Sequence, residues 1–505
     1  YADDVLLFMS DLDTSGPRII HLLDGFALLS GLQVNYAKST IYWMGEEEGG
    51  AEWARDFQRA GDGFNYLGVY VSPNNIVAWG KNVTPIMSRL KSDVEHWSKL
   101  PLSLMGRSAI FKMMYLPRFL YQLGNFPFAV SRVQFGKINA ILRSFLWNNE
   151  MPRIALAKCF QPTFFGGMAT PDIESYYQAS HLVIVNEWWF DNRHDPAFAL
   201  DKWSMGSRSL SSLLYGRGVL AGLPPATLVV IKLWRSVLRR MGWQWTLTEC
   251  TPLWESKLLA PLALLPGGPR WDRIGISALG DVVEGTVLKS FQTLQTEYDL
   301  HRSQFYTYLQ MRHILTPLLK GLEDLPESNP LEGRLLLGRR GPHAISQIYK
   351  GLLLHQKGWD FPALRSAWEA DLGSLSEDEW LEARGASKKV AIATRLRVIQ
   401  LRYFHRTYLT RYRLWRGGMI ASPECLRCGE HRGDLLHTVW TCPVIQIYWN
   451  RVMDCLQEVL GGVIPRSPKL AILHVEEGID HNRYRGALIH LGLVLAQREI
   501  ALHWK

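Results

Sequence analysis

Four potential metal ligands lie close together near the carboxyl end of the chain. They follow the pattern Cys425-x2-Cys428-x8-His437-x4-Cys442. Three thiolates and one imidazole form a ligand set that binds Zn²⁺ tetrahedrally, and protein atoms would fill all four positions. The spacing therefore predicts a structural zinc site. His431 is an alternative ligand that the spacing leaves open, and four unrelated reduced side chains are the competing interpretation.

Two adjacent carboxylates, Asp3 and Asp4, precede a short apolar run at residues 5–8. Two buried carboxylates are costly unless a cation neutralises them. Mg²⁺ takes one or two carboxylates together with phosphate oxygens, and two-metal phosphoryl transfer uses such carboxylates to hold the attacking and leaving oxygens. The pair is therefore a candidate magnesium site. A solvated turn that carries two acids is the simpler interpretation of the pair taken alone.

A basic segment precedes the four metal ligands. Residues 395–416 contain seven arginines and no acid. On one helix, four of these side chains fall within about 40° of one another: Arg395, Arg402, Arg406 and Arg413. This pattern predicts an amphipathic helix with an arginine stripe, and such a stripe suits phosphate binding. A merely solvated basic face is the alternative.

The composition fits a globular chain with an anionic partner. The 505 residues carry 56 Lys and Arg against 47 Asp and Glu, a formal net charge of +9, which favours nucleic acid. Apolar residues make up 47% of the chain, enough to bury a sizeable core. Six cysteines in this length exclude a disulfide framework. We expect neither a membrane span nor a signal peptide, because no long apolar run and no basic leader occurs.

Hydrophobic periodicity predicts the elements that would position these residues. It indicates helices over 17–30, 84–97 and 104–116, and short strands over 5–8 and 41–44. Pro17 suits the first turn of its helix, and Gly31 suits the C-cap. Residues 181–390 indicate several helices joined by short loops. Residues 323–330 are acidic and hold two prolines, which predicts an exposed linker.

Three segments of the first 75 residues carry a family resemblance. They are Tyr1-Ala2-Asp3-Asp4, Gly31…Asn35-x-x-Lys38-Ser39 and Tyr66-Leu67-Gly68. In this order they resemble the last three palm motifs of the LINE-type non-LTR retrotransposon reverse transcriptases. The series Trp97, Gly106-Arg107, Lys112, Leu116-Pro117 is similar to that family's thumb. The Cys-Cys-His-Cys pattern resembles the zinc module that these proteins often carry near the C-terminus.

The resemblance implies roles for particular residues. Asp3 would bind catalytic Mg²⁺ with Asp4 beside it, and Lys38 would lie near the incoming nucleotide. Tyr66, Leu67 and Gly68 would begin a primer-grip hairpin. Arg107 and Lys112 would contact the phosphates of an RNA template and a DNA primer or target. The resemblance also implies nuclear and cytoplasmic localisation.

The predicted fold class is α+β and predominantly α-helical. The predicted domains are a palm remnant with a small antiparallel sheet (1–75), a thumb-like helical domain (76–180), a helical connector (181–390) and a basic helix plus zinc-binding domain (391–505). The family implies RNA-directed DNA polymerisation, primed at a nicked target, for a full-length parent.

We expect the 505 residues alone to be inactive, because the family's palm also needs an Asp from an upstream strand. Two alternatives stay open. One is a non-catalytic nucleic-acid-binding module of a degenerate retroelement, and the other is an unstable translation product without a selected role.

Overall fold

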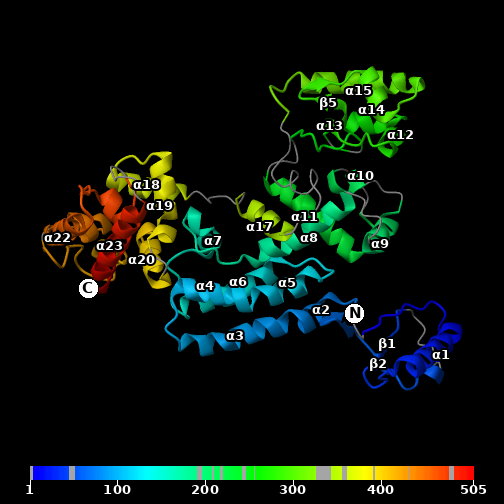
Figure 1. The fold of residues 1–505 in the computed structure, drawn as a ribbon, viewed down its shortest axis with the longest axis horizontal. Helices are drawn as coiled ribbons and strands as arrows, with labels where there is room; N and C mark the ends of the chain where they lie inside the picture. Colours follow the sequence, from blue (N-terminus) through cyan, green and yellow to red (C-terminus); the bar gives the residue numbers. More distant parts are fainter. Residues whose placement is uncertain are drawn as a thin grey trace.

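The computed structural model describes most of the chain: residues 4–44, 52–189, 196–206, 210–215, 220–241, 246–254, 256, 258–325, 343–354, 361–390, 393–429, 432–476 and 483–504. Helices dominate this part, and its strands form two-stranded sheets (Figure 1). The predicted class, α+β and predominantly helical, is confirmed. Among the described helices, none has both the length and the apolar character needed to cross a bilayer.

The first helix, α1 (Leu12–Ser30), begins earlier than the periodicity predicts. Asp11 is its N-cap, so Pro17 lies inside the helix and not in its first turn. Gly31 ends the helix with a φ of 73°, as its C-cap role requires. The apolar run at residues 5–8 is exposed and forms no strand. An extended segment needs a paired neighbour to be stable as a strand, and no described strand pairs with this run.

Two small sheets follow α1, and they differ in direction. β1 (Thr40–Tyr42) pairs in parallel with β2 (Gln58–Ala60), and the short helix η1 (Glu52–Ala54) precedes β2. β3 (Phe64–Tyr66) and β4 (Val69–Val71) form an antiparallel hairpin. The sequence predicts one small antiparallel sheet in this region. The β3–β4 hairpin is antiparallel as predicted, whereas the β1–β2 sheet is parallel.

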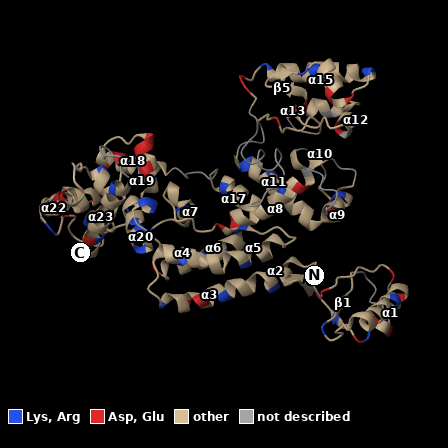
Figure 2. Cartoon of the chain, viewed as in Figure 1, with Lys and Arg blue, Asp and Glu red and all other residues tan. Residues whose placement is uncertain are grey.

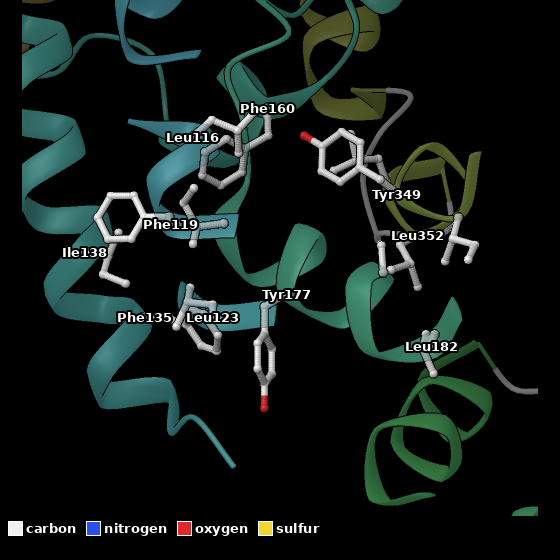
Figure 3. Packing of buried hydrophobic residues seen from close by; sticks show 14 of the residues in the cluster. Leu116, Phe119, Leu123, Phe135, Ile138, Phe160, Tyr177, Leu182, Tyr349 and Leu352 are labelled. Atoms are coloured by element: carbon white, nitrogen blue, oxygen red, sulfur yellow. The ribbon is translucent and has the colours of Figure 1, made fainter. Parts of the chain in front are cut away.

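The centre of the molecule is a stack of helices around one continuous hydrophobic cluster. The elements are α2 (Asn75–Asn82), α3 (Thr84–Ser98), α4 (Leu104–Met114), α5 (Leu116–Gly124), α6 (Arg132–Trp147), α7 (Leu156–Phe160), η2 (Thr163–Phe165), α8 (Ile173–Trp189), α9 (Pro196–Met205), α10 (Leu210–Tyr215), α11 (Pro225–Met241) and α17 (Ala344–Leu354). Figure 3 shows Phe119 and Leu123 of α5 facing α6, and Leu352 of α17 near Leu182 of α8.

The central cluster crosses residue 180, where the predicted thumb-like domain and connector meet. Buried residues of α3 to α6 belong to the same cluster as those of α8, α11 and α17. The four-part domain division stays a prediction. The predicted helix over 104–116 is present as α4, which gives way at Tyr115 to α5.

Residues 246–325 have a second hydrophobic cluster of their own. Their elements are η4 (Ala260–Leu264), α12 (Gly268–Arg273), α13 (Leu279–Val282), β5 (Val283–Glu284), β6 (Val287–Leu288), α14 (Phe291–Tyr298), η5 (Arg302–Gln304) and α15 (Phe305–Leu319). The buried rings of Trp254 and Trp271 belong to this cluster and meet edge to face, with their centres 6.2 Å apart. Of the predicted linker at 323–330, residues 326–330 lie outside the described part.

The last part of the chain packs two further clusters side by side. Its elements are α18 (Pro362–Leu372), α19 (Glu377–Lys389), α20 (Thr394–Phe404), α21 (Arg411–Arg416), η6 (His437–Thr441), α22 (Pro443–Leu460), η7 (Lys469–Leu473) and α23 (Arg483–Leu502). Trp368 and Trp380, both fully buried, anchor one cluster, and Trp449 and Met453 anchor the other.

The prediction of one continuous helix over residues 395–416 is wrong. α20 ends at Phe404, and α21 begins only at Arg411. Arg406 adopts a φ of 53°, a left-handed conformation that cannot continue a helix. The break is held by a distant contact, because His405 Nε2 donates to the Gly166 carbonyl at 2.7 Å. Burial lowers the pKa of His405 to about 4, so the ring is neutral at pH 7.

Candidate metal centre

The first two ligands lie on a tight hairpin turn. Glu424 and Arg432 pair across its base as an antiparallel bridge. Within the turn, the Gly429 N–H donates to the Cys425 carbonyl at 2.8 Å. Gly429 has a φ of 71°, which glycine adopts without steric cost. This closure brings the Cys428 thiol back toward Cys425.

The other two ligands flank a short π-helical segment, η6. The Asp434 carboxylate accepts from the His437 N–H at 2.9 Å and starts this segment. The wider π turn ends where the Cys442 N–H donates to the His437 carbonyl at 3.0 Å. Cys442 is then the N-cap of α22, with Pro443 in its first turn. Both ends of η6 therefore face the hairpin turn.

The four side chains, named here the Cys/His cluster, converge on one point. Their ligand atoms all lie within 4.8 Å of one another. The Sγ atoms of Cys425 and Cys442 are 3.9 Å apart, and Cys428 Sγ is 3.4 Å from His437 Nε2. The four predicted ligands therefore lie together. His431, the alternative ligand, lies outside the described residues. The arrangement suits one metal ion.

Without a cation, burial in the Cys/His cluster disfavours the charged thiolate form of its cysteines. Cys442 is fully buried and Cys425 is 4% exposed. Burial raises the pKa of the Cys442 thiol, and the adjacent Cys425 raises it further. A cation between the thiols would reverse this preference and hold them as thiolates. The donor set and its burial therefore fit a cation.

The hairpin turn is fastened to the surrounding core by an arginine inside the Cys-x2-Cys pair. Arg427 donates to the Thr438 carbonyl at 2.7 Å and to the His503 carbonyl at 3.0 Å. On the other side, Trp449 Nε1 donates to the Val439 carbonyl at 2.7 Å. Contacts from α22 and from His503, which directly follows α23, thus hold the cluster in place.

The predicted catalytic residues lie in a different environment. Tyr1 to Asp3 fall outside the described residues, so Asp3 has no described position. Asp4 is exposed. Lys38 is also exposed, on a turn before β1 in which the Asn35 Oδ1 accepts from its N–H at 3.2 Å. No enclosed site is described around these residues.

The predicted primer-grip residues form a hairpin. Tyr66 ends β3, and Leu67 and Gly68 have φ of 47° and 78°, the positive pair that a type I′ turn requires. The turn lies on α5, where Gln122 Nε2 donates to the Gly68 carbonyl at 2.8 Å and the Tyr121 hydroxyl donates to the Leu67 carbonyl. The hairpin shape follows the expectation, and its role in holding a primer stays a prediction.

The two predicted thumb contacts differ in accessibility. Lys112 is exposed on α4. Arg107 is 4% exposed, and its guanidinium donates to the carbonyls of Phe145 and Trp97, both at 3.4 Å. A buried side chain of this kind joins helices and does not reach a nucleic-acid phosphate. The burial of Arg107 therefore contradicts the predicted contact between this side chain and a phosphate.

The arginines of the predicted stripe are divided by the break between α20 and α21. Arg395 is exposed near α4 and donates to the Pro101 carbonyl at 3.2 Å. Arg402 is half-buried on α20. Arg406 is paired with Asp371 at 2.6 Å, and Arg413 belongs to α21. Figure 2 shows basic residues on α20 and acidic residues on α19, the helix that packs against it.

Sequence reasoning missed two residues beside the Cys/His cluster. Arg432 and Asp434 lie between the second and third ligands and line a hollow next to α21. An Asp three residues before a helical His is a recognisable N-cap signal, so the sequence contains enough to predict the role of Asp434. Arg432 gave no such signal. No protein-family model matches the chain, so the geometry of the cluster carries the functional argument.

Proposed function

We propose that the chain is the C-terminal portion of a LINE-type non-LTR retrotransposon reverse transcriptase, and that residues 391–505 form its zinc-organised nucleic-acid-binding module. The observation that carries the proposal is the convergence of Cys425, Cys428, His437 and Cys442 on one point. The order of the sequence motifs, from Tyr1-Ala2-Asp3-Asp4 to this cluster, supports the family assignment.

Zinc is the metal that best fits the donor set. With Zn–S bonds of about 2.3 Å and Zn–N bonds of about 2.05 Å, a tetrahedral site separates two sulfurs by about 3.8 Å and a sulfur from a nitrogen by about 3.6 Å. The observed separations are 3.9 Å for Cys425–Cys442 and 3.4 Å for Cys428–His437. Three soft thiolates also disfavour Mg²⁺ and Ca²⁺, which prefer oxygen ligands.

The zinc would be structural. Four protein ligands leave no open coordination position for substrate or water. When bound, the ion supplies the cross-link between the hairpin turn and the start of α22. The chain's own residues orient the ligands, because Asp434 holds the N–H of His437 and Arg427 holds the turn.

Nucleic acid is the proposed partner because of charge. Residues 395–416 contain seven arginines and no acid, and the chain as a whole carries a net charge of +9. Asp371 balances Arg406, whereas Arg395 and Arg413 are exposed. Arginine on exposed helices binds phosphates without reading sequence. For a full-length parent, the family implies RNA-directed DNA polymerisation with Mg²⁺ at Asp3. For these residues alone we propose binding without polymerisation.

The alternative is a nucleic-acid-binding relic of a degenerate retroelement. Both proposals share the zinc module and differ at Asp3 and Asp4. A transcript that encodes the upstream palm and its Asp would favour a working parent. A stop codon upstream of Tyr1 would favour the relic.

Metal analysis of the purified chain tests the zinc module. We expect one zinc per chain and a large loss of zinc in Cys428→Ser. Cys455→Ser is the matched control, because Cys455 is an exposed cysteine on α22 outside the cluster. Equal zinc in both variants would contradict the ligand assignment.

Primer extension tests the proposed lack of polymerase activity. We expect the chain to extend no primer on an RNA template in the presence of Mg²⁺. Extension that Asp3→Ala abolishes would overturn this part of the proposal. Binding of the same template by filter retention is measured in parallel, so that absence of binding and absence of chemistry are separated.

A further inference from the structure

A hollow of about 350 Å³ lies between α18, α21 and the hairpin turn of the Cys/His cluster. Its wall includes Arg406, Tyr408, Tyr412, Arg413, Arg432 and Asp434. Three guanidiniums around one concavity, against the two carboxylates of Asp371 and Asp434, leave an excess of positive charge. An anion is the ligand that this charge favours.

One of the three arginines forms the floor of the hollow. Arg406 donates to Asp371 Oδ2 at 2.6 Å and to the Ala367 carbonyl at 3.1 Å. Its guanidinium also lies over the Trp368 ring, 4.4 Å from the ring centre. These contacts fix the loop between α20 and α21 onto α18. Arg406 therefore shapes the hollow, and its charge is largely balanced.

The other two arginines are placed to bind the ligand. Arg413 is exposed and uses Nη1 to donate to the Arg406 carbonyl at 2.6 Å. The side chain of Arg432 is 57% exposed, and its Nε is 3.4 Å from Asp434 Oδ2. A guanidinium has five N–H donors, so these contacts leave donors of both residues for a phosphate.

The metal-binding turn sets the position of Arg432. The guanidinium lies 3.7 Å from the centre of the Tyr412 ring, in cation–π contact. The backbone beside it is joined to α21, because the Tyr412 N–H donates to the Gly433 carbonyl at 3.1 Å. Arg432 also forms the antiparallel bridge with Glu424 at the base of the turn. A metal that closes the turn thus holds one wall of the hollow.

An exposed aromatic ring continues the same surface. Trp415 is 42% exposed, and its ring lies 5.8 Å from Tyr412 at an angle of 30°. Arg432 covers one face of Tyr412, so Trp415 offers the more accessible ring. Unpaired bases stack on such rings, whereas bases in a duplex are already stacked on one another.

We propose that this surface binds single-stranded nucleic acid, with a phosphate between Arg413 and Arg432 and the adjoining base on Trp415. The proposal rests on the nucleic-acid-binding function proposed above and specifies that the nucleic acid is single-stranded. The metal at the Cys/His cluster contributes through Arg432. Arg413 is held instead by its own hydrogen bonds to the carbonyls of Arg406 and Tyr408, which lie outside the metal-binding turn.

The test measures fluorescence anisotropy of labelled short oligonucleotides with the full chain. The probes are one sequence as single-stranded DNA, as single-stranded RNA and as a DNA duplex. The variants are Arg413→Gln, Arg432→Gln and Trp415→Ala. The matched control is Arg451→Gln, because Arg451 is an exposed arginine of α22 that does not line the hollow.

We expect Trp415→Ala to weaken single-strand binding about fivefold or more, the effect of losing one stacked base. Each Arg→Gln variant should lower the salt slope of binding by about 0.7, the value for one phosphate contact on a single strand. Arg451→Gln should match the wild type. Tighter binding of DNA or of RNA by the wild type identifies which strand the surface prefers.

A second arm tests the role of the metal. In a Cys428→Ser background, Arg432→Gln should add little, whereas Arg413→Gln should keep its full effect. Non-additivity of this kind reports coupling between the turn and Arg432. An undiminished effect of Arg432→Gln without the metal would overturn the metal's contribution.

The outcomes separate this proposal from the one on which it rests. If the wild type binds and all three variants bind equally well with unchanged salt slopes, the hollow is not the site, and the general function stands. Preferential binding of the duplex would overturn the single-strand assignment. If the wild type binds none of the probes, both proposals fail.

Discussion

Both ends of the molecule carry sequence motifs, but the two sets of motifs lie in opposite environments. Near the amino end, the apolar face of α1 is exposed: Leu22 is 72% and Leu29 is 91% accessible. Near the carboxyl end, Cys442 and Trp380 are fully buried. A motif defines a site only where a packed core fixes its side chains. In the described residues this holds for the Cys/His cluster and not for Asp4 or Lys38.

Of the changes predicted here, removal of the metal should have the largest effect, and it should affect only the carboxyl end of the molecule. Structural zinc contributes about 10–16 kcal/mol of binding free energy in small zinc-dependent peptides. We therefore expect chelation to unfold the region around η6 and α22, and to leave the central helices folded. Hydrogen exchange of the chain with and without chelator measures this. Unchanged protection of residues 432–460 would contradict the role of the metal.

Truncation of a large aromatic ring should have the second largest effect, and it should destabilise the carboxyl end much more than the amino end. Trp380→Ala removes a fully buried side chain, and we expect the free energy of unfolding of its region to fall by about 3–5 kcal/mol. Phe26→Ala, at a ring that is 54% exposed, should change stability by less than about 0.5 kcal/mol. Denaturant unfolding measures both. Similar losses would mean that α1 is covered by a partner in solution.

A buried histidine pair should make the carboxyl region sensitive to acid. His474 and His490 face each other through their Nδ1 atoms at 3.1 Å, and His490 Nε2 donates to Glu476 at 2.8 Å. Gln497 Nε2 donates to His474 Nε2 at 3.1 Å, so His474 must donate from Nδ1 to the lone pair of His490. The chain of hydrogen bonds is complete with both rings neutral.

The sign of the pH effect follows from the pKa shifts. Burial lowers the pKa of both histidines from 6.5, because it disfavours the charged ring. The unfolded state therefore binds protons first, so stability is full above pH 6.5 and falls as the pH drops toward the folded pKa values. We expect thermal unfolding to show this loss, and His490→Gln to flatten it. The matched control is His21→Gln, at an exposed site on α1, which should leave the profile unchanged.

The smallest predicted effect concerns the loop between α20 and α21. Arg406→Gln should lower stability by about 1–2 kcal/mol, because it removes the partly exposed pair with Asp371 and the contact with Trp368. Arg416→Gln, at an exposed arginine of α21, should have no measurable effect. Equal losses in the two variants would mean that Arg406 does not fix the loop.

The sequence predicts features whose partners are close along the chain. The Cys/His cluster follows from spacings of two, eight and four residues, and Gly31 follows from its place after a periodic segment. It does not predict features that depend on distant partners. The break after Phe404 is one, because residues 402–410 contain neither Gly nor Pro, and it is held by Asp371 and Gly166.

Burial of charged residues is the second kind of feature that the pattern does not predict. Arg107 sits in a helix with few other charges, which suits either a nucleic-acid contact or a buried joint between helices. In the structure Arg107 is a buried joint between helices. The pattern does not predict this, because the carbonyl of Phe145 that it binds lies 38 residues away along the chain. The histidine pair is hidden for the same reason, since its rings come from the end of η7 and from α23.

X-ray absorption at the zinc edge of the purified chain tests the central claim most directly, because it reports the ligands of the bound ion. We predict one zinc per chain with three sulfur neighbours at about 2.3 Å and one nitrogen at about 2.0–2.1 Å. A shell of oxygen and nitrogen alone would contradict the assignment of Cys425, Cys428 and Cys442. Absence of stoichiometric zinc would contradict the proposed module itself.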